Sequence, residues 1–300
     1  MEKNIDILLE SGNNEFNIME FTINGDSFGI NVAKVKEIMM PRPVKQMPKA
    51  HPSVEGIFKP REDLITVINL PQYLDESQTE IPEKSLFIIT NFNNMNIAFR
   101  VHTVEGIRKI SWKDIQKPDK TIYSGADGLA TGIAQCGDQL VTILDFEKIV
   151  ADISPETSIQ VSDIDDFVGR RRNERKIMVA EDSKLLTALI LECLHKSGYV
   201  NVDTSDNGQE LWDKLCEMRD NGAYEEIGCI ITDIEMPQMD GHRVTKLIKT
   251  DATLKKLPVI IFSSLISEEM KIKGEQLGAD DQISKPEIAH LVDRIDKLLI

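Results

Sequence analysis

Residues 176–300 alternate between short apolar runs and longer amphipathic runs, and this alternation restricts the fold more than any other feature of the sequence. The runs KIMVAE, GCIITDI and PVIIFSS have the length of strands, whereas SKLLTALILECLHKSG has the pattern of a helix that begins after Ser183 and ends at Gly198. Strands that alternate with helices form a parallel sheet covered on both faces. The sequence therefore predicts a doubly wound α/β domain with five parallel strands over 176–300.

Residues 15–153 instead carry short apolar runs that are separated by turn signals. Asn24-Gly25 and Gly137-Asp138 each lie between two β-rich runs, which is the sequence signature of a hairpin. Many short strands at close spacing are typical of a β-barrel or a β-sandwich. We expect an all-β domain here, with short helices at 33–39 and 144–151.

Residues 154–175 are polar and lie between the two predicted domains, so we interpret them as a linker. Arginines at positions 170, 171, 172 and 175 could form a patch for nucleic acid, but nearby aspartates neutralise them in part, which favours a solvated linker. The formal net charge of the chain is −15, which also argues against nucleic acid, because cations dominate binding to phosphates. Residues 1–14 form a separate N-terminal segment.

We expect neither a secretory signal nor a membrane-spanning run. The N-terminus lacks a basic stretch followed by a long apolar one, and no apolar run approaches the roughly 18 residues that a membrane span requires. Cys136, Cys193, Cys216 and Cys229 form no CxxC pair, which predicts reduced thiols rather than a disulfide or metal framework. Together these features predict a cytoplasmic protein.

Polar residues follow four of the predicted parallel strands. Glu181 and Asp182 follow the first strand, Asp233 the third, Ser263 the fourth and Lys285 the fifth. Ligands of parallel α/β sheets bind beyond the carboxyl ends of the strands, so we expect these groups to meet in one crevice. Each residue alone is common at a helix start or in solvent, and only their order along the strands indicates a site.

Three clustered carboxylates repel one another and require a cation. Mg²⁺ suits them, because it prefers oxygen ligands and keeps several waters, which leaves positions for a phosphoryl oxygen. Lys285 would neutralise a second phosphoryl oxygen, and Ser263 would donate a hydrogen bond to a third. The sequence thus predicts a site for phosphoryl transfer to Asp233.

Residues 176–300 resemble the receiver domain of two-component response regulators, which has a flavodoxin-like fold. The resemblance rests on DIEMPQMDG at 233–241, together with Glu181-Asp182, Ser263 and Ser284-Lys285-Pro286. The match extends over the whole of the predicted α/β domain.

The resemblance to receiver domains implies a role for each residue of the site. Asp233 would be the phosphoacceptor, and Asp182 and Asp233 would bind Mg²⁺ directly. Glu181 would help through a water molecule, and Glu235 would contribute its backbone carbonyl. Ser263 would be the hydroxyl that responds to phosphorylation.

One position departs from the receiver pattern. An aromatic residue usually lies three positions before the lysine of the site, and here that position is Gln282. The usual coupling, in which the hydroxyl moves toward the phosphoryl group and the aromatic ring turns inward, therefore cannot be assumed for this chain. Phosphorylation should survive this change, whereas the path of the output signal is left open.

Residues 15–153 resemble CheW, the chemotaxis coupling module, whose fold is a pair of small β-barrels. The resemblance rests mainly on apolar motifs, which are FTI at 21–23, FGI at 28–30, VKEI at 35–38, VINL at 67–70 and DFEK at 145–148. The family's N-L-R-G motif reads Lys59-Pro60-Arg61-Glu62 here and keeps only the arginine. We predict that Glu37 and Arg61 bind partners.

A CheW-like domain followed by a receiver domain is the arrangement of CheV-type chemotaxis coupling proteins. The resemblance implies an adaptor that joins membrane chemoreceptors to the histidine kinase CheA and is phosphorylated on Asp233. It implies no contact with nucleic acid, no membrane insertion and no turnover of a separate substrate. One alternative is a phosphate sink that drains CheA while coupling is constitutive, and a small phosphohydrolase is the third hypothesis.

Overall fold

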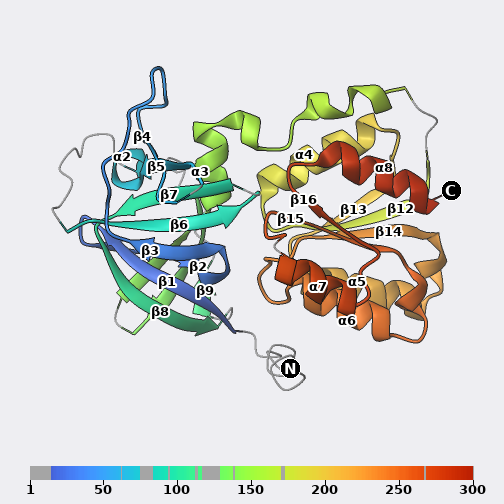
Figure 1. The fold of residues 1–300 in the computed structure, drawn as a ribbon. Helices are drawn as coiled ribbons and strands as arrows, with labels where there is room; N and C mark the ends of the chain where they lie inside the picture. Colours follow the sequence, from blue (N-terminus) through green and yellow to red (C-terminus); the bar gives the residue numbers. More distant parts are fainter. Residues whose placement is uncertain are drawn as a thin grey trace. The chain divides into compact units, whose positions relative to one another are not determined.

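The computed structural model describes residues 15–61, 63–74, 84–93, 95–111, 114–116, 129–137, 139–169, 173–266 and 268–299. The chain divides into two compact units, Met1–Pro155 and Glu156–Ile300 (Figure 1). Several positions singled out in the sequence lie outside the described residues; they are 1–14, Glu62, Asp138, Arg170, Arg171 and Arg172.

The first unit consists mainly of two sheets. The six-stranded sheet has the order β8-β1-β2-β11-β10-β9. Its strands are β1 (Glu15–Ile23), β2 (Asp26–Asn31), β8 (Thr103–Ser111), β9 (Ile115–Gln116), β10 (Ala130–Cys136) and β11 (Gln139–Leu144). The five-stranded sheet has the order β3-β6-β7-β5-β4. Its strands are β3 (Val35–Met39), β4 (Val54–Phe58), β5 (Ile65–Asn69), β6 (Leu86–Phe92) and β7 (Met95–Val101).

Both hairpins predicted from the sequence are present in the first unit. Asn24 and Gly25 connect β1 to β2 with φ of 55° and 92°, and Ile23 pairs with Asp26 across the turn. A two-residue turn with positive φ at both positions matches the twist of the flanking strands. Gly137, with φ of 64°, follows β10 in the same way, where Cys136 pairs with Gln139.

The helix predicted at 33–39 is wrong. A short 3₁₀ turn, η1 (Val32–Lys34), leads directly into strand β3, which pairs antiparallel with β6. The β-branched residues Val35 and Ile38 favour a strand, and pairing with β6 decides the conformation. The second predicted helix is present as α3 (Phe146–Ile153), where the side chain of Asp145 accepts a hydrogen bond from the Lys148 amide at 3.0 Å.

Aromatic side chains join the elements of the first unit. The rings of Phe99 on β7 and Phe146 on α3 meet edge to face with centroids 4.7 Å apart, and Phe21 on β1 packs on Phe146 at 6.2 Å. All three side chains are fully buried. A further short helix, α2 (Leu70–Leu74), follows β5 and buries Leu70 in the same cluster.

The second unit contains five parallel strands in the order β13-β12-β14-β15-β16, as the sequence predicts. They are β12 (Lys176–Ala180), β13 (Val202–Ser205), β14 (Ile227–Thr232), β15 (Val259–Ser263) and β16 (Asp281–Ser284). The helices are α4 (Lys184–Lys196), α5 (Gly208–Asp220), α6 (Gly241–Thr250), α7 (Glu268–Gln276) and α8 (Ile288–Leu299). Residues of α4 and α8 share one apolar cluster and those of α5 and α6 another, so helices cover both faces of the sheet (Figure 1). Short 3₁₀ turns η5 (Ala223–Glu226) and η6 (Leu254–Lys256) precede β14 and β15.

Part of the segment interpreted as a linker is packed against the second unit. It contains the 3₁₀ turns η3 (Pro155–Thr157) and η4 (Val161–Phe167). Ile159 and Ile164 are 3% and 0% exposed, and both belong to the apolar cluster of α4 and α8. The apolar positions are spaced among acidic residues, which is why the segment looks like a solvated linker in the sequence.

Candidate functional site

Three carboxylates meet at the carboxyl ends of two neighbouring strands. Glu181 and Asp182 follow β12, and Asp233 follows β14. One carboxylate oxygen of each residue lies within 4.8 Å of the others. Glu181 and Asp233 are 3% and 5% exposed, whereas Asp182 is half-buried. The structure thus brings together the acidic residues that the sequence singled out.

Backbone pairing at the strand ends fixes two of these carboxylates. The Asp233 amide donates to the Ala180 carbonyl, and the Glu181 amide donates to the Ser205 carbonyl, both at 3.0 Å. Each carboxylate also accepts a local amide, Asp233 Oδ1 from Ile234 at 2.6 Å and Glu181 Oε1 from Ser183 at 3.1 Å. The sheet therefore positions both side chains before any ligand binds.

Lys285 supplies a positive charge inside the acidic cluster. Its Nζ lies 2.7 Å from Glu181 Oε2 and 3.1 Å from Asp233 Oδ2, and its side chain is 2% exposed. Burying charges is costly unless they are paired and hydrogen-bonded, so the ammonium stabilises both buried carboxylates. One lysine leaves the three carboxylates with a net negative charge.

Ser263 lies at the same end of the sheet. It ends β15, between β14 and β16, and its side chain is fully buried. Its Oγ accepts a hydrogen bond from the Leu265 amide at 3.3 Å, and its carbonyl accepts one from the Lys285 amide at 3.1 Å. The second contact joins the hydroxyl-bearing strand to the residue that carries the ammonium.

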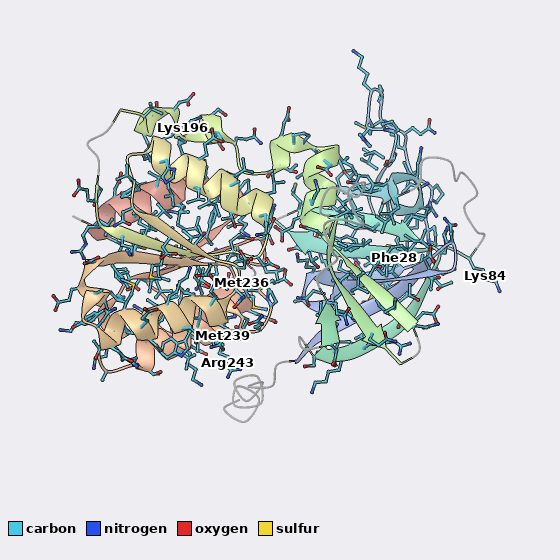
Figure 2. The ribbon with its side chains drawn as sticks, turned by 180° about the vertical axis from the view of Figure 1, so that it is seen from behind. Phe28, Lys84, Lys196, Met236, Met239 and Arg243 are labelled. Atoms are coloured by element: carbon cyan, nitrogen blue, oxygen red, sulfur yellow. The ribbon has the colours of Figure 1, made fainter. Side chains whose placement is uncertain are left out.

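The loop that follows Asp233 is held in place by two close backbone approaches. A Cβ on Gly241 would lie 1.9 Å from the Asp233 carbonyl oxygen, and one on Gly208 would lie 2.4 Å from the Met239 carbonyl oxygen. Met236 and Met239, labelled in Figure 2, are 1% and 4% exposed and anchor the loop in the core. The sequence motif identifies Gly241, but it gives no signal for Gly208, which contacts the loop from another helix.

Glu235 and His242 flank the same loop. Glu235 lies two residues beyond Asp233 and is half-buried, and the expected contribution of its backbone carbonyl stays a prediction. His242 is 3% exposed, and burial together with the nearby Lys273 charge lowers its pKa to about 4. At neutral pH the imidazole is therefore uncharged.

The chemistry of the cluster suits a hard divalent cation. The ligand atoms are all carboxylate oxygens, and two of the three carboxylates are buried and already oriented by backbone amides. Such an oxygen set matches the preference of Mg²⁺, and the half-exposed Asp182 leaves the cluster open to water and to a phosphoryl group. Glu181, Asp182 and Asp233 could therefore hold such an ion.

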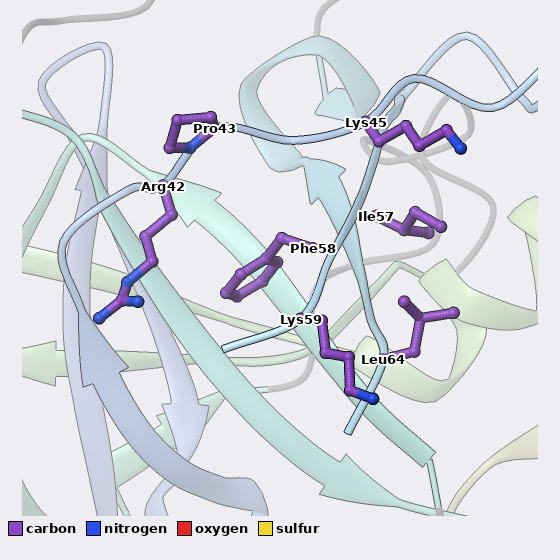
Figure 3. A pocket seen from close by; sticks show the side chains of 7 residues that line it. All are labelled: Arg42, Pro43, Lys45, Ile57, Phe58, Lys59 and Leu64. Carbon is purple, nitrogen blue, oxygen red and sulfur yellow. The ribbon is translucent and has the colours of Figure 1, made fainter. Parts of the chain in front are cut away.

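The first unit has a separate hollow of about 370 Å³ beside strand β4. It is lined by Arg42, Pro43, Lys45, Ile57, Phe58, Lys59 and Leu64 (Figure 3). The Lys45 and Ile57 backbones exchange hydrogen bonds of 2.8 and 2.9 Å, which attaches the segment before β4 to the edge of that strand.

The hollow combines an apolar floor with unpaired cations. Leu64 is 62% exposed, and no ion pair between described residues involves Arg42, Lys45 or Lys59. Glu37 is exposed on β3 and Arg61 is exposed after β4, but neither lines the hollow. The sequence singled out only those two residues, because the hollow forms between segments whose pairing no motif predicts.

Within the part of the chain that the structure describes, no helix is long and apolar enough to cross a membrane.

The two units match two known families. Residues 17–154 match the CheW-like domain, and residues 177–296 match the response regulator receiver domain. The chemotaxis protein CheV3 of Helicobacter pylori is 28% identical over 285 residues, which cover 91% of this chain and 88% of that protein. CheV2 of the same organism is 29% identical over 308 residues and covers 96% of both chains. The chemotaxis protein CheW of Treponema pallidum is 27% identical over 139 residues, 45% of this chain and 82% of its own length.

Proposed function

The chain belongs to the CheV-type chemotaxis coupling proteins, which join a CheW-like domain to a receiver domain, and we propose that phosphorylation of Asp233 regulates its coupling activity. As a coupling adaptor it acts through protein contacts. We propose that these contacts join the histidine kinase CheA to the cytoplasmic tips of membrane chemoreceptors. The adaptor would then reside in the cytoplasm at receptor arrays without inserting into the bilayer.

The observation that carries the proposal is the Asp233 carboxylate held between Lys285 and two further acids. A carboxylate oxygen of Asp233 would attack the phosphorus of a phosphohistidine. The new P–O bond forms as the P–N bond breaks, and the bonding electron pair leaves with the imidazole nitrogen, which takes up a proton. The Lys285 ammonium would neutralise one phosphoryl oxygen, and the Ser263 hydroxyl would donate a hydrogen bond to another.

The proposed cofactor is Mg²⁺, held by Asp182 and Asp233 directly, by Glu181 through water and by the Glu235 carbonyl. When bound, the ion supplies positive charge to the oxygens of the transferred phosphoryl group. The chain's own residues orient the nucleophile, because the amide of Ile234 fixes one oxygen of Asp233 at 2.6 Å. We expect no turnover of a separate substrate, since the reaction ends on a residue of the chain itself.

We also propose that the basic hollow beside β4 is a partner-binding surface of the coupling unit. Three cations that have no ion-pair partner among the described residues surround apolar side chains here, and this combination suits an acidic partner surface that carries an apolar anchor. This local positive charge stands out in a chain whose net charge is −15. Glu37 and Arg61 would extend the surface outside the hollow.

Reversing two charges of the hollow is expected to weaken partner binding. In Lys45→Glu/Lys59→Glu, two carboxylates would oppose an acidic partner, and the affinity for CheA or for a receptor tip should fall roughly tenfold at low salt. Isothermal titration calorimetry with each partner measures this change. Lys84→Glu, which reverses an exposed charge of the same unit outside the hollow, is the matched control. Equal affinities for the double variant and the control would exclude this surface.

Regulated coupling is tested in reconstituted receptor–CheA assemblies that contain this chain and no other receiver protein. Beryllofluoride with Mg²⁺, a phosphoryl analogue, should change CheA activity when the wild-type chain is present. It should have no effect with Asp233→Asn, because the analogue requires the carboxylate. A phosphate sink makes a different prediction: phosphoryl transfer to the chain stays rapid, but the analogue leaves CheA activity unchanged.

A further inference from the structure

Gln282 lies on β16, the edge strand of the receiver sheet, and contacts helix α7, which is drawn on the same side of the sheet as α5 and α6 (Figure 1). Its Nε2 donates a hydrogen bond of 2.6 Å to the backbone carbonyl of Lys271, in the middle of α7. The side chain therefore links strand β16 to the helix that immediately precedes it in the chain.

Gly274 of α7 makes room for the Gln282 carboxamide. A Cβ on Gly274 would lie 2.2 Å from Gln282 Oε1 and 2.5 Å from its Cδ, so any other residue at this position requires the carboxamide of Gln282 to move away. A glycine inside a helix is destabilising relative to alanine. This glycine is buried and matched to one particular neighbour, and we call Gln282 and Gly274 together the clasp.

The clasp holds α7 only weakly. Gln282 Oε1 is buried and has no hydrogen-bond partner among the described residues. A buried acceptor without a partner is unfavourable, which offsets much of what the Nε2 bond contributes. Gly274 is moreover the only fully buried residue of α7 among those described. Helices with few buried contacts open at low free energy, so α7 is poised to detach.

The clasp is connected to the acidic site through two short segments. Residues 264–267 lie between Ser263 and the start of α7 in the sequence, and the Leu265 amide in this segment donates a hydrogen bond to Ser263 Oγ. On the other side, β16 carries Gln282 and ends beside Lys285, whose amide bonds to the Ser263 carbonyl. Turning Ser263 Oγ toward a phosphoryl group would remove the acceptor of the Leu265 amide and loosen the segment that leads into α7.

We propose that Gln282 is a positioning residue that holds α7 through the clasp, and that phosphorylation of Asp233 releases the clasp and frees α7. The proposal rests on the proposed role of Asp233 as phosphoacceptor. In this proposal, the hydrogen bond from the Gln282 carboxamide to α7 couples the phosphorylation site to the surface of the domain. By linkage, anything that releases the clasp must also favour the phosphorylated state by the same factor.

A double-mutant cycle in the full-length chain tests the contact itself. Gly274→Ala should raise hydrogen exchange of the α7 amides on the order of tenfold, because its Cβ displaces the carboxamide. In Gly274→Ala/Gln282→Ala the methyl group enters the space that the carboxamide leaves, so exchange should return toward the level of Gln282→Ala alone. Exchange of α5 amides should not change in any variant. If the effects of the two substitutions on α7 exchange were additive, the proposed contact between Gln282 and Gly274 would be wrong.

Coupling to the acidic site is tested by binding of beryllofluoride with Mg²⁺. In the wild type, the analogue should raise exchange of the α7 amides. Gly274→Ala should bind the analogue on the order of fivefold more tightly, because its clasp is already released. If Gly274→Ala does not fold, Gln282→Ala provides the same comparison with a smaller expected gain.

The results of these two experiments distinguish failure of the role proposed for Gln282 from failure of the role proposed for Asp233. The two substitutions could have non-additive effects on hydrogen exchange while leaving the affinity for beryllofluoride unchanged. The contact would then be purely structural, and the regulatory role of Gln282 would be overturned. The role of Asp233 as phosphoacceptor would be unaffected. Failure of the wild type to bind the analogue at all would instead overturn the role of Asp233 as phosphoacceptor.

Discussion

Asp233→Asn is expected to reduce transfer of a labelled phosphoryl group from CheA to the background of an unphosphorylated control. The amide has nearly the shape of the carboxylate, but it lacks the negative charge and the nucleophilic oxygen that would form the P–O bond. The variant should fold, because the substitution also removes one of three mutually repelling acids at the strand ends. Autoradiography of the separated proteins after mixing with phosphorylated CheA measures the transfer.

The matched control for this experiment is Asp240→Asn. Asp240 lies on the same loop but is exposed, and its carboxylate caps α6 by accepting the Arg243 amide at 2.8 Å. An asparagine caps a helix about as well, so labelling of this variant should equal that of the wild type. Labelling of Asp233→Asn at the level of Asp240→Asn would exclude Asp233 as the acceptor.

The acidic cluster was predictable from sequence because it depends on a regular feature of the fold. Parallel strands end at one edge of a sheet, so residues that follow the strands in order must lie near one another. Glu181, Asp182, Asp233 and Lys285 meet for this reason. The same regularity predicted the five parallel strands, since apolar strand patterns alternate with helical ones over the whole second unit.

The features that the sequence did not predict depend on contacts between separate secondary-structure elements. Pairing with β6 places 35–39 in strand β3, where the sequence analysis expected a helix. Packing against α4 and α8 buries Ile159 and Ile164 in a segment of linker-like composition. The departure at Gln282 was visible in the sequence, but its match with Gly274 appears only once α7 and β16 are placed together.

Lys285→Met is expected to destabilise the receiver unit by about 3–5 kcal/mol, because it leaves Glu181 and Asp233 buried without their cation. For a unit of this size the midpoint of thermal unfolding should fall by roughly 10 °C. Scanning calorimetry of the full-length chain without divalent cations measures the transition. Lys184→Met is the control, since this lysine is 70% exposed and lies 3.6 Å from Asp206 in a surface pair worth at most about 1 kcal/mol.

Magnesium makes the same substitution a test of the metal site. If the three carboxylates hold Mg²⁺, the ion stabilises the folded state by mass action, and its charge replaces part of what the ammonium supplied. Added Mg²⁺ should therefore raise the unfolding midpoint of Lys285→Met by more than that of the wild type, in which the cluster is already partly neutralised. Phosphoryl transfer should nevertheless stay about 10²–10³-fold slower, because the ammonium that would neutralise a phosphoryl oxygen is gone. Equal shifts with Mg²⁺ in both proteins would mean that the ion binds away from Glu181 and Asp233, and the proposed ligand set would then be wrong.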